Sequence, residues 1–157
     1  GALFCDVALM APVPGRGLRT PVLASGPGAQ AFAARFQPLG MPVTVVDDRP
    51  GSAAARKLLR SVFMKGMAAA LLEGLAAAEQ LGCADWYRKE VASVFQEADT
   101  ALVERLITGS RKHAVRRVQE MMAAAQLLME QDVPPRVALA TADILRDLAG
   151  EREASRR

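Results

Sequence analysis

Four cationic side chains lie near the start of a proline-free, mostly apolar stretch, residues 51–82. They are Arg56, Lys57, Arg60 and Lys65. If this stretch is one helix, a turn of about 100° per residue places Lys57 roughly 60° from Arg60 and roughly 80° from Lys65. Such a cluster attracts anions, and neighbouring cations also favour the neutral lysine amine that accepts a proton. The spacing therefore allows Lys57, Arg60 and Lys65 to border one anion-binding pocket.

A solvated helix face is the alternative interpretation of the same four cations. Basic residues in the first turns oppose the helix macrodipole, so helix stability does not explain them. Surface lysines and arginines are nevertheless common in any protein. Arg56 lies about 100° around the helix from Lys57 and is expected to face solvent.

A second basic cluster lies in SRKHAVRR and comprises Arg111, Lys112, His113, Arg116 and Arg117. No aromatic residue interleaves it, Glu120 follows closely, and the net charge of the chain is only +3. A solvated helix start or a pocket wall is therefore preferred to a nucleic-acid site, and we expect no nucleic-acid partner. His113 is the only histidine, so no metal site is expected.

Cysteine usage and hydropathy indicate a cytoplasmic protein. Cys5 and Cys83 are far apart and show no C-x-x-C spacing, which fits a reducing compartment. The first residues lack the basic segment of a signal peptide. The most apolar stretch, residues 62–78, is interrupted by Lys65 and Glu73. We expect it to be a buried helix rather than a membrane span.

The first third of the chain has the pattern of an α/β domain. Short apolar segments bounded by turn residues predict three strands, with a helix between the second and third. The strands lie in LFCDVALM, TPVLASG and MPVTVVDD, and the helix lies in GAQAFAARFQPLG. The continuous apolar run VTVV predicts a strand buried on both faces. Such a unit is incomplete by itself, and the fold class is an α/β remnant followed by an all-α domain.

After Gly51 the pattern predicts helices alone. The first runs from about Ser52 to Leu81, roughly 45 Å at 1.5 Å per residue, with Ser52 as its N-cap and Gly82 as its stop. Three later helices are predicted in ADWYRKEVASVFQ, EADTALVERLI and SRKHAVRRVQEMMAAAQLLMEQ, the last begun by Ser110. A final helix, PPRVALATADILRDLAGERE, starts on the Pro134-Pro135 pair.

This order resembles the 6-phosphogluconate dehydrogenase and β-hydroxyacid dehydrogenase superfamily, in a poorly characterised branch with a distinctive C-terminal helical domain. The resemblance rests on FCDVALMAPVPG, TPVLASGP and VTVVDDRPGSAAARKLL, which runs into one very long helix. It implies that residues 1–50 form the C-terminal end of a Rossmann-type NAD(P)-binding domain. Residues 51–157 are then an all-helical domain for substrate binding and homodimerisation.

The family's acid/base lysine follows an approach of the type G-x-x-x-A-x-K, which Gly51, Ala55 and Lys57 match. The resemblance therefore assigns Lys57 as the catalytic residue. The family usually continues K-x-x-N, but Arg60 stands at the position of the asparagine and is able to hold a carboxylate or phosphate instead. Ser61 and Lys65 lie on the same side of the helix and are further candidates for substrate binding.

The family's substrate loop, A-P-V-S-G-G, matches Ala11 to Arg16. This match assigns Pro14, Gly15 and Arg16 to substrate binding, although Pro14 replaces the serine and removes its hydroxyl and its backbone donor. A later K-D pair of the family falls near Gln119 and Glu120, so that lysine is not retained.

The resemblance implies an NAD(P)-dependent oxidoreductase that oxidises a small anionic hydroxyacid, phosphorylated or not, with NAD or NADP as cofactor. The fingerprint G-x-G-x-x-G does not occur in the sequence, so the chain alone is expected to be inactive. A non-catalytic dimerisation module derived from the same scaffold is the alternative. A binder of anions or nucleic acid that uses both basic clusters is a third, weaker hypothesis.

Overall fold

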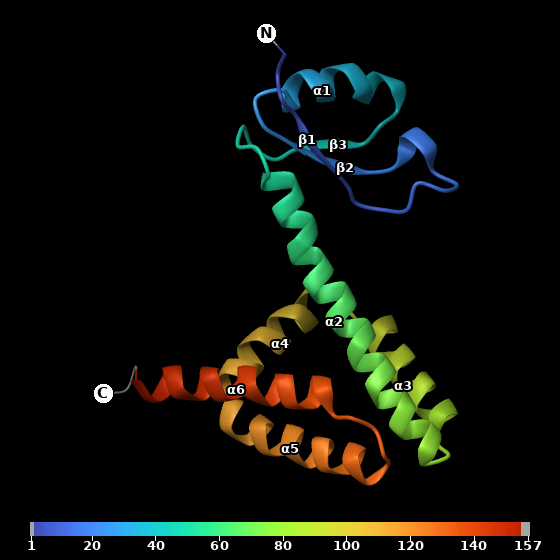
Figure 1. The fold of residues 1–157 in the computed structure, drawn as a ribbon, viewed down its shortest axis with the longest axis vertical. Coiled ribbons are helices and arrows are strands. Elements are labelled where there is room, and N and C mark those ends of the chain that lie inside the picture. The colour runs from blue at the N-terminus through green and yellow to red at the C-terminus, as the bar shows by residue number, and fades with distance from the viewer. Residues whose placement is uncertain (1, 155–157) are drawn as a thin grey trace. The chain divides into compact units, whose positions relative to one another are not determined.

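A computed structural model describes residues 2–154 (Figure 1). The chain divides into two compact units, Gly1–Lys65 (unit 1) and Gly66–Arg157 (unit 2). Unit 1 contains a three-stranded sheet with one helix, and a 29-residue helix, α2, begins in unit 1 and ends in unit 2. The rest of unit 2 is helical. The predicted fold class, an α/β remnant followed by an all-α region, is confirmed.

The sheet of unit 1 has the strand order β1-β2-β3. Strand β1 (Asp6–Leu9) runs antiparallel to β2 (Val22–Ser25), and β2 runs parallel to β3 (Val43–Val45). Helix α1 (Ala29–Phe36) forms the crossover between the two parallel strands. The predicted order of strand, strand, helix and strand is therefore correct.

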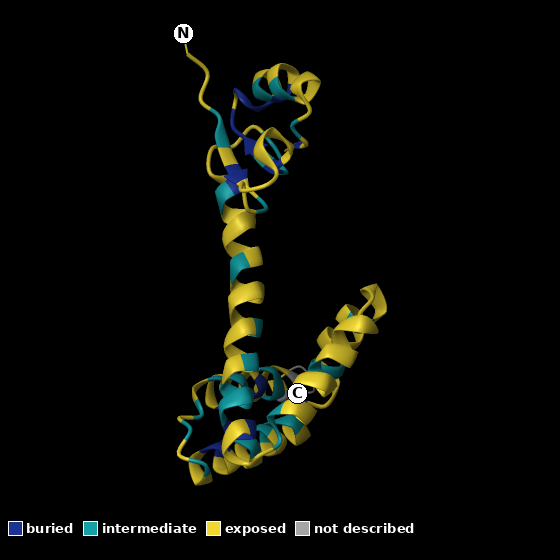
Figure 2. Cartoon of the chain, turned by 90° about the vertical axis from the view of Figure 1, so that its right-hand side faces the viewer, coloured by how far each residue is buried: buried dark blue, intermediate teal, exposed yellow. Residues whose placement is uncertain are grey.

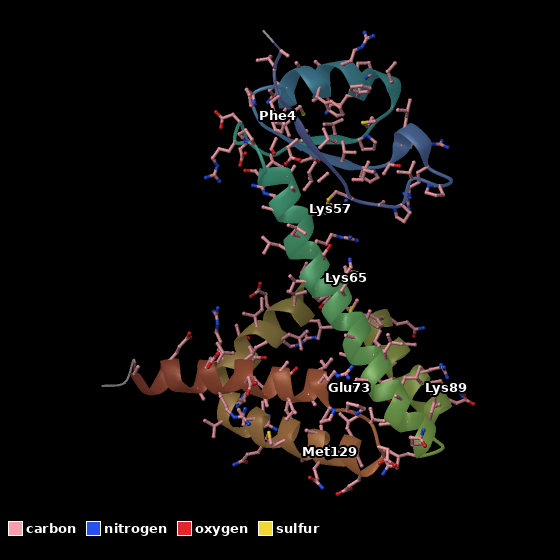
Figure 3. All side chains as sticks on the ribbon, in the orientation of Figure 1. Phe4, Lys57, Lys65, Glu73, Lys89 and Met129 are labelled. Carbon is pink, nitrogen blue, oxygen red and sulfur yellow. The ribbon has the colours of Figure 1, made fainter. Side chains whose placement is uncertain are left out.

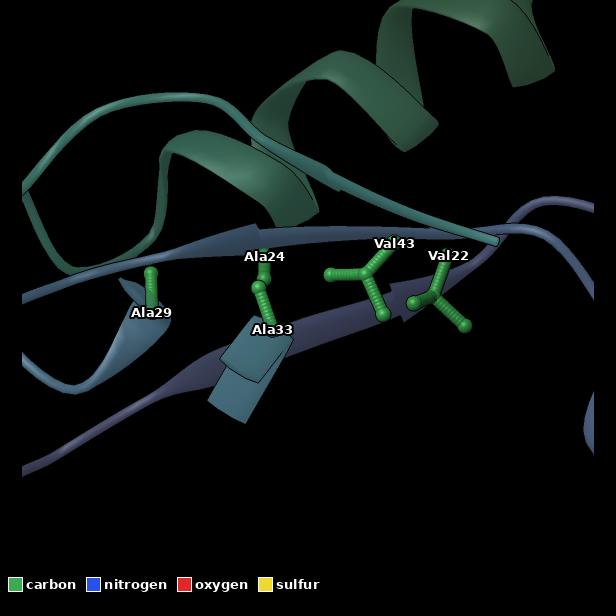
Figure 4. Close-up of a cluster of buried hydrophobic side chains, with 5 residues drawn as sticks. All are labelled: Val22, Ala24, Ala29, Ala33 and Val43. Carbon is green, nitrogen blue, oxygen red and sulfur yellow. The ribbon is translucent and has the colours of Figure 1, made fainter. Parts of the chain in front are cut away.

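The core of unit 1 lies between the sheet and α1 (Figure 4). Its buried side chains are Val22, Ala24, Ala29, Ala33 and Val43. The predicted burial of β3 on both faces is wrong for this chain, because Val43 is buried whereas Thr44 is exposed. A single helix, α1, supplies the apolar side chains that cover one face of the strand.

Helix α2 (Ser52–Gln80) ends as the sequence predicts. Gly82 adopts φ 69°, which is favourable for glycine, and the N–H of Cys83 donates to the C=O of Ala78 at 2.8 Å. This 6→1 hydrogen bond between Cys83 and Ala78 is characteristic of a Schellman motif.

The predicted N-cap of α2 is wrong. The C=O of Gly51, not of Ser52, accepts the first intrahelical bond, from the N–H of Ala55 at 2.9 Å, and Gly51 has φ 91°. Two free N–H groups of the first turn are instead satisfied by side chains from the sheet, Ser25 and Asp6. A cap supplied from so far along the sequence leaves no local signature.

The prediction that residues 62–78 form a buried helix is also wrong for this chain. Only 11% of the most apolar window of α2 is buried, and Leu58, Leu59, Val62 and Phe63 are exposed (Figure 2). By length and composition alone, α2 is the one helix of the described part that is able to cross a membrane. The first half of α2 therefore presents apolar side chains that the described residues of unit 1 do not cover.

Unit 2 continues with four further helices. They are α3 (Ala84–Gln96), α4 (Thr100–Lys112), α5 (Ala114–Glu130) and α6 (Arg136–Ala154). Helices α5 and α6 lie side by side in opposite directions (Figure 1). Their buried residues meet the end of α2 in a core of Ala77, Ala125, Leu128 and Ala138.

Ser110 does not begin a helix, which corrects the predicted boundary. Gly109 and Ser110 lie inside α4, and the break comes at His113. The Arg117 guanidinium on α5 donates to the Ser110 hydroxyl at 2.6 Å and lies against Gly109. Gly109 therefore allows the Arg117 side chain to approach α4 closely and does not end the helix.

Candidate functional site

A groove of about 580 Å³ opens between α2 and the loop that follows β1, entirely within unit 1. Leu9 at the end of β1 lines the groove together with Met10, Ala11, Pro12, Val13 and Arg16 of the loop, and α2 contributes Lys57, Arg60, Ser61 and Lys65. One wall is thus an irregular segment that follows a strand, and the other is two turns of helix.

The structure brings five of the seven predicted site residues to this groove. They are Arg16, Lys57, Arg60, Ser61 and Lys65. Lys57 and Lys65 are labelled on α2 in Figure 3. Arg56 does not line the groove. Whether the lining residues bind a substrate stays a prediction.

Pro14 and Gly15 lie in the same loop but do not line the groove. The N–H of Arg16 donates to the C=O of Val13 at 2.9 Å, and Gly15 has φ 78°. Proline followed by a glycine with positive φ fits a type II turn. In the structure these two residues shape the turn that returns the chain to the groove at Arg16.

The groove is cationic without compensating acids. Four of its ten lining residues are lysine or arginine, and none is aspartate or glutamate. Among the side chains that the structure describes, no ion pair joins Arg16, Lys57, Arg60 or Lys65 to a carboxylate. The Lys57 side chain is exposed, so the described residues leave it open to a ligand.

The start of α2 is held by a partly buried hydrogen-bond network. The N–H of Ala53 donates to the Ser25 hydroxyl at 2.9 Å, and the N–H of Ala54 donates to Asp6 Oδ2 at 3.0 Å. The Ser25 hydroxyl itself donates to Asp6 Oδ2 at 3.1 Å. The sequence interpretation missed both residues; the one available signal was an aspartate inside an otherwise apolar strand.

A second carboxylate lies beside the loop that leads into α2. The hydroxyl of Ser52 lowers the pKa of Asp47, helped by the Arg49 N–H at 3.0 Å and by the charges of Arg49 and Arg56. Arg56 thus has an acidic neighbour outside the groove, which separates it from the four groove cations.

The second basic cluster is divided by the helix break at His113. Arg116 pairs with Glu120 one turn along α5, and Arg117 bonds to Ser110. Among the described residues, no group of three or more His, Cys, Asp or Glu side chains is placed to hold a metal ion.

Sequence comparison connects the helical part to a domain family. Residues 78–148 match a domain of unknown function, DUF1932. A protein of Methanothermus fervidus, an uncharacterized 28.5 kDa protein in a 7S RNA 5′ region, is 28% identical over 104 residues. That match covers 64% of this chain and 40% of the archaeal protein.

Structural comparison extends the similarity to almost the whole chain. A conserved protein of unknown function, described as similar to 3-hydroxyacid dehydrogenases, is 30% identical with a TM-score of 0.52, covering 94% of this chain and 57% of that one. A reductive aminase from Aspergillus terreus in complex with NADPH has a TM-score of 0.72 at 20% identity, over 96% and 56%. An imine reductase from Myxococcus stipitatus in complex with NADP⁺ has a TM-score of 0.68 at 22% identity, over 94% and 58%.

These matches agree with the resemblance that the sequence motifs predict. The chain spans about half the length of the proteins that it matches. Residues 78–148 are similar to the DUF1932 family, and the chain shares its fold over most of its length with 3-hydroxyacid dehydrogenase-like proteins and imine reductases.

Proposed function

We propose that this chain supplies the substrate-facing part of an NAD(P)-dependent oxidoreductase that acts on a small anionic hydroxyacid. The observation that carries this proposal is the acid-free groove in which Lys57, Arg60 and Arg16 converge. Relatives of the same fold have been solved with NADPH and NADP⁺, which supports a nicotinamide cofactor for the whole protein.

Each groove residue has a chemical task in this proposal. Lys57 takes the proton of the substrate hydroxyl, which requires the neutral amine. Arg60 and Arg16 lie on opposite walls and bind the carboxylate or phosphate, because a guanidinium offers two parallel donors. Ser61 and Lys65 add a hydroxyl and a further cation farther along α2. A bound nicotinamide would supply the hydride acceptor.

The strict pyrophosphate loop G-x-G-x-x-G is absent from the 157 residues. The looser form G-x-G-x-x-A occurs once, from Gly26 to Ala31, but there the N–H of Gly28 donates to the C=O of Phe4 at 2.7 Å. We therefore propose that the complete protein binds NADP or NAD through residues outside this sequence. Alone, the chain is expected to bind neither cofactor.

A homodimer is proposed to cover the exposed side of α2. Leu58, Leu59, Val62 and Phe63 are each about two-thirds exposed or more, and contiguous apolar surface of this kind marks an interaction site. A second copy that covers these residues would also exclude water near Lys57. Analytical ultracentrifugation of the full-length protein in the absence of lipid tests this: a monomer that binds vesicles would indicate a membrane surface instead.

The free thiols of Cys5 and Cys83 fit the proposed cytoplasmic location.

Replacing Lys57 by Met in the full-length protein tests the catalytic role. The substitution keeps the length of the side chain but removes the proton acceptor, so turnover should fall by roughly 10²- to 10⁴-fold. Formation of reduced nicotinamide across a panel of hydroxyacids measures turnover, and cofactor titration should give a nearly unchanged affinity. Unchanged turnover refutes the assignment.

A non-catalytic dimerisation module is the second candidate, and the arginine at the usual asparagine position favours it. Titration of the full-length protein with NADP and NAD separates the two functions. Binding of neither cofactor would favour the module.

A further inference from the structure

The first turn of α2 carries Lys57, and two residues of the sheet hold that turn. We infer that Asp6 and Ser25 are positioning residues, which hold Lys57 in register with the loop across the groove. This inference rests on the proposed catalytic role of Lys57 and adds residues that the sequence motifs do not include.

Asp6 and Ser25 face each other across the antiparallel pair β1-β2, where Asp6 is opposite Ser25. Asp6 Oδ2 accepts two hydrogen bonds, from the Ser25 hydroxyl and from the Ala54 N–H. The Ser25 oxygen accepts the N–H of Ala53. Both Ser25 and Ala53 are fully buried, which excludes water from the bond between them, whereas Asp6 and its two bonds are half-buried.

The network reaches Lys57 through one residue, Ala53. In α-helical geometry, the N–H of residue 57 bonds to the C=O of residue 53. The N–H of Ala53 is fixed by Ser25, so the peptide groups on both sides of Ala53 are constrained. Ala54 is three residues before Lys57 and therefore on a neighbouring part of the helix surface. Loss of the cap frays the turn from which the lysine projects.

Strand β1 ties the two walls of the groove together. Asp6 begins this strand, and Leu9 at its end leads directly into the groove loop with Met10 and Ala11. The bond from Ala54 to Asp6 therefore joins the helix wall to the strand that supports the loop wall. A shift of about 1 Å between reacting groups costs rates as much as about 10²-fold.

Glu73 provides the matched control, because it caps a helix in the same way without serving the groove. Its carboxylate accepts the N–H groups of Val137 and Ala138 at 2.7 and 2.9 Å. Glu73 lies on α2 beside the start of α6 (Figure 3). A merely structural cap should behave as Glu73 does.

The test measures the reactivity of Lys57 in the full-length protein. The probe is pyridoxal 5′-phosphate, an anionic aldehyde that condenses with a neutral amine to give an imine and water. Borohydride reduction fixes the adduct, and peptide mapping gives the rate at Lys57 and at Lys89, an exposed lysine on α3. The rates are recorded over a pH series for the wild type, Asp6→Ala, Asp6→Asn and Glu73→Ala.

We expect Asp6→Ala to slow adduct formation at Lys57 by about tenfold, because Lys57 is then no longer held in a fixed position relative to the cations that bind the phosphate of the probe. Asp6→Asn keeps an oxygen acceptor and should recover most of the rate. The rate at Lys89 should be unchanged throughout, and Glu73→Ala should leave Lys57 at its wild-type rate. If Asp6→Ala does not fold, Ser25→Ala, which keeps the carboxylate, should give a smaller loss that is likewise confined to Lys57.

A wild-type rate at Lys57 in both Asp6→Ala and Ser25→Ala overturns the positioning role, as does an equal fall at Lys89. These outcomes are distinct from failure of the proposed function. Normal turnover in Lys57→Met refutes catalysis by Lys57 whatever Asp6→Ala does, and the adduct rates then report on positioning alone.

Discussion

Cations in unit 1 gather around a groove without acids, whereas several arginines of unit 2 are paired with carboxylates. Arg88 lies 3.7 Å from Glu79, Arg116 pairs with Glu120, and Arg146 pairs with Asp143. The groove residues Arg16, Lys57, Arg60 and Lys65 have no such partner within the described residues. Pairs on an exposed helix surface add little stability.

This difference separates two uses of charge. In unit 2 the alternating signs along exposed helices neutralise each other locally. In unit 1, four like charges repel one another when no anion is bound, which costs stability and leaves binding energy for an anionic ligand. Both units nevertheless use the same device at a helix start, a carboxylate that accepts two hydrogen bonds.

Reversing one groove charge should give the largest effect that distinguishes the units. Arg60→Glu replaces a groove cation by an anion, and we expect it to weaken binding of inorganic pyrophosphate by about tenfold or more, equivalent to about 1.4 kcal/mol. Arg116→Glu changes the net charge equally but acts on a paired residue, so it should change the affinity by less than about twofold. Titration calorimetry on the full-length protein measures both.

Equal losses in the two variants would break the comparison. The groove cations would then act only through the overall charge of the protein, as a solvated helix face does. A steeper salt dependence for the wild type than for Arg60→Glu would support a local site, because fewer ion contacts remain to be screened in the variant.

Glu73→Ala should have a smaller effect, on stability alone. It leaves the N–H groups of Val137 and Ala138 without their acceptor, which should cost about 1 kcal/mol of unfolding free energy. Chemical denaturation measures the change, and Glu90→Ala on the exposed side of α3 is the control. Weaker binding of pyrophosphate in Glu73→Ala would show that this cap also serves the groove.

The order of strands and helices was predictable because short stretches of sequence determine it. The pattern of short apolar segments and prolines defines three strands, Gly82 stops α2, and the Pro134-Pro135 pair precedes α6. Sequence signals that span only a few residues can be interpreted without knowledge of the fold. The error at Ser110 has the same origin, because Gly109 serves a contact with Arg117 and not a helix end.

The side chains that cap the starts of α2 and α6 were not predictable because they are distant in sequence from the groups that they bind. Asp6 and Ala54 are 48 residues apart, and Glu73 and Val137 are 64 apart. Nor does local pattern reveal that Pro14 and Gly15 form a turn outside the groove lining. The part of the candidate site that helical spacing determines, Lys57, Arg60 and Lys65, was predictable. The part formed where the strands meet α2, Asp6 and Ser25, was not.

Titration of Tyr87 should have the smallest effect at neutral pH and gives a direct comparison of burial. Desolvation raises the pKa of Tyr87, whose ring packs against Gly74 of α2 and whose hydroxyl donates to the C=O of Leu71 at 3.4 Å. Because the folded pKa lies above the unfolded value of about 10, the neutral phenol stabilises the fold below that pH. This stability is lost as the pH rises through the folded pKa.

Tyr87 is the only tyrosine of the 157 residues, and the difference in ultraviolet absorbance between the wild type and Tyr87→Phe reports its ionisation alone. We expect a midpoint above about 10 in the native protein and a lower one in denaturant, with Tyr87→Phe removing the tyrosine signal and flattening the alkaline loss of stability. Equal midpoints in the two states would show that unit 2 does not desolvate this side chain, and the contrast with the exposed groove of unit 1 would then rest on ion pairing alone.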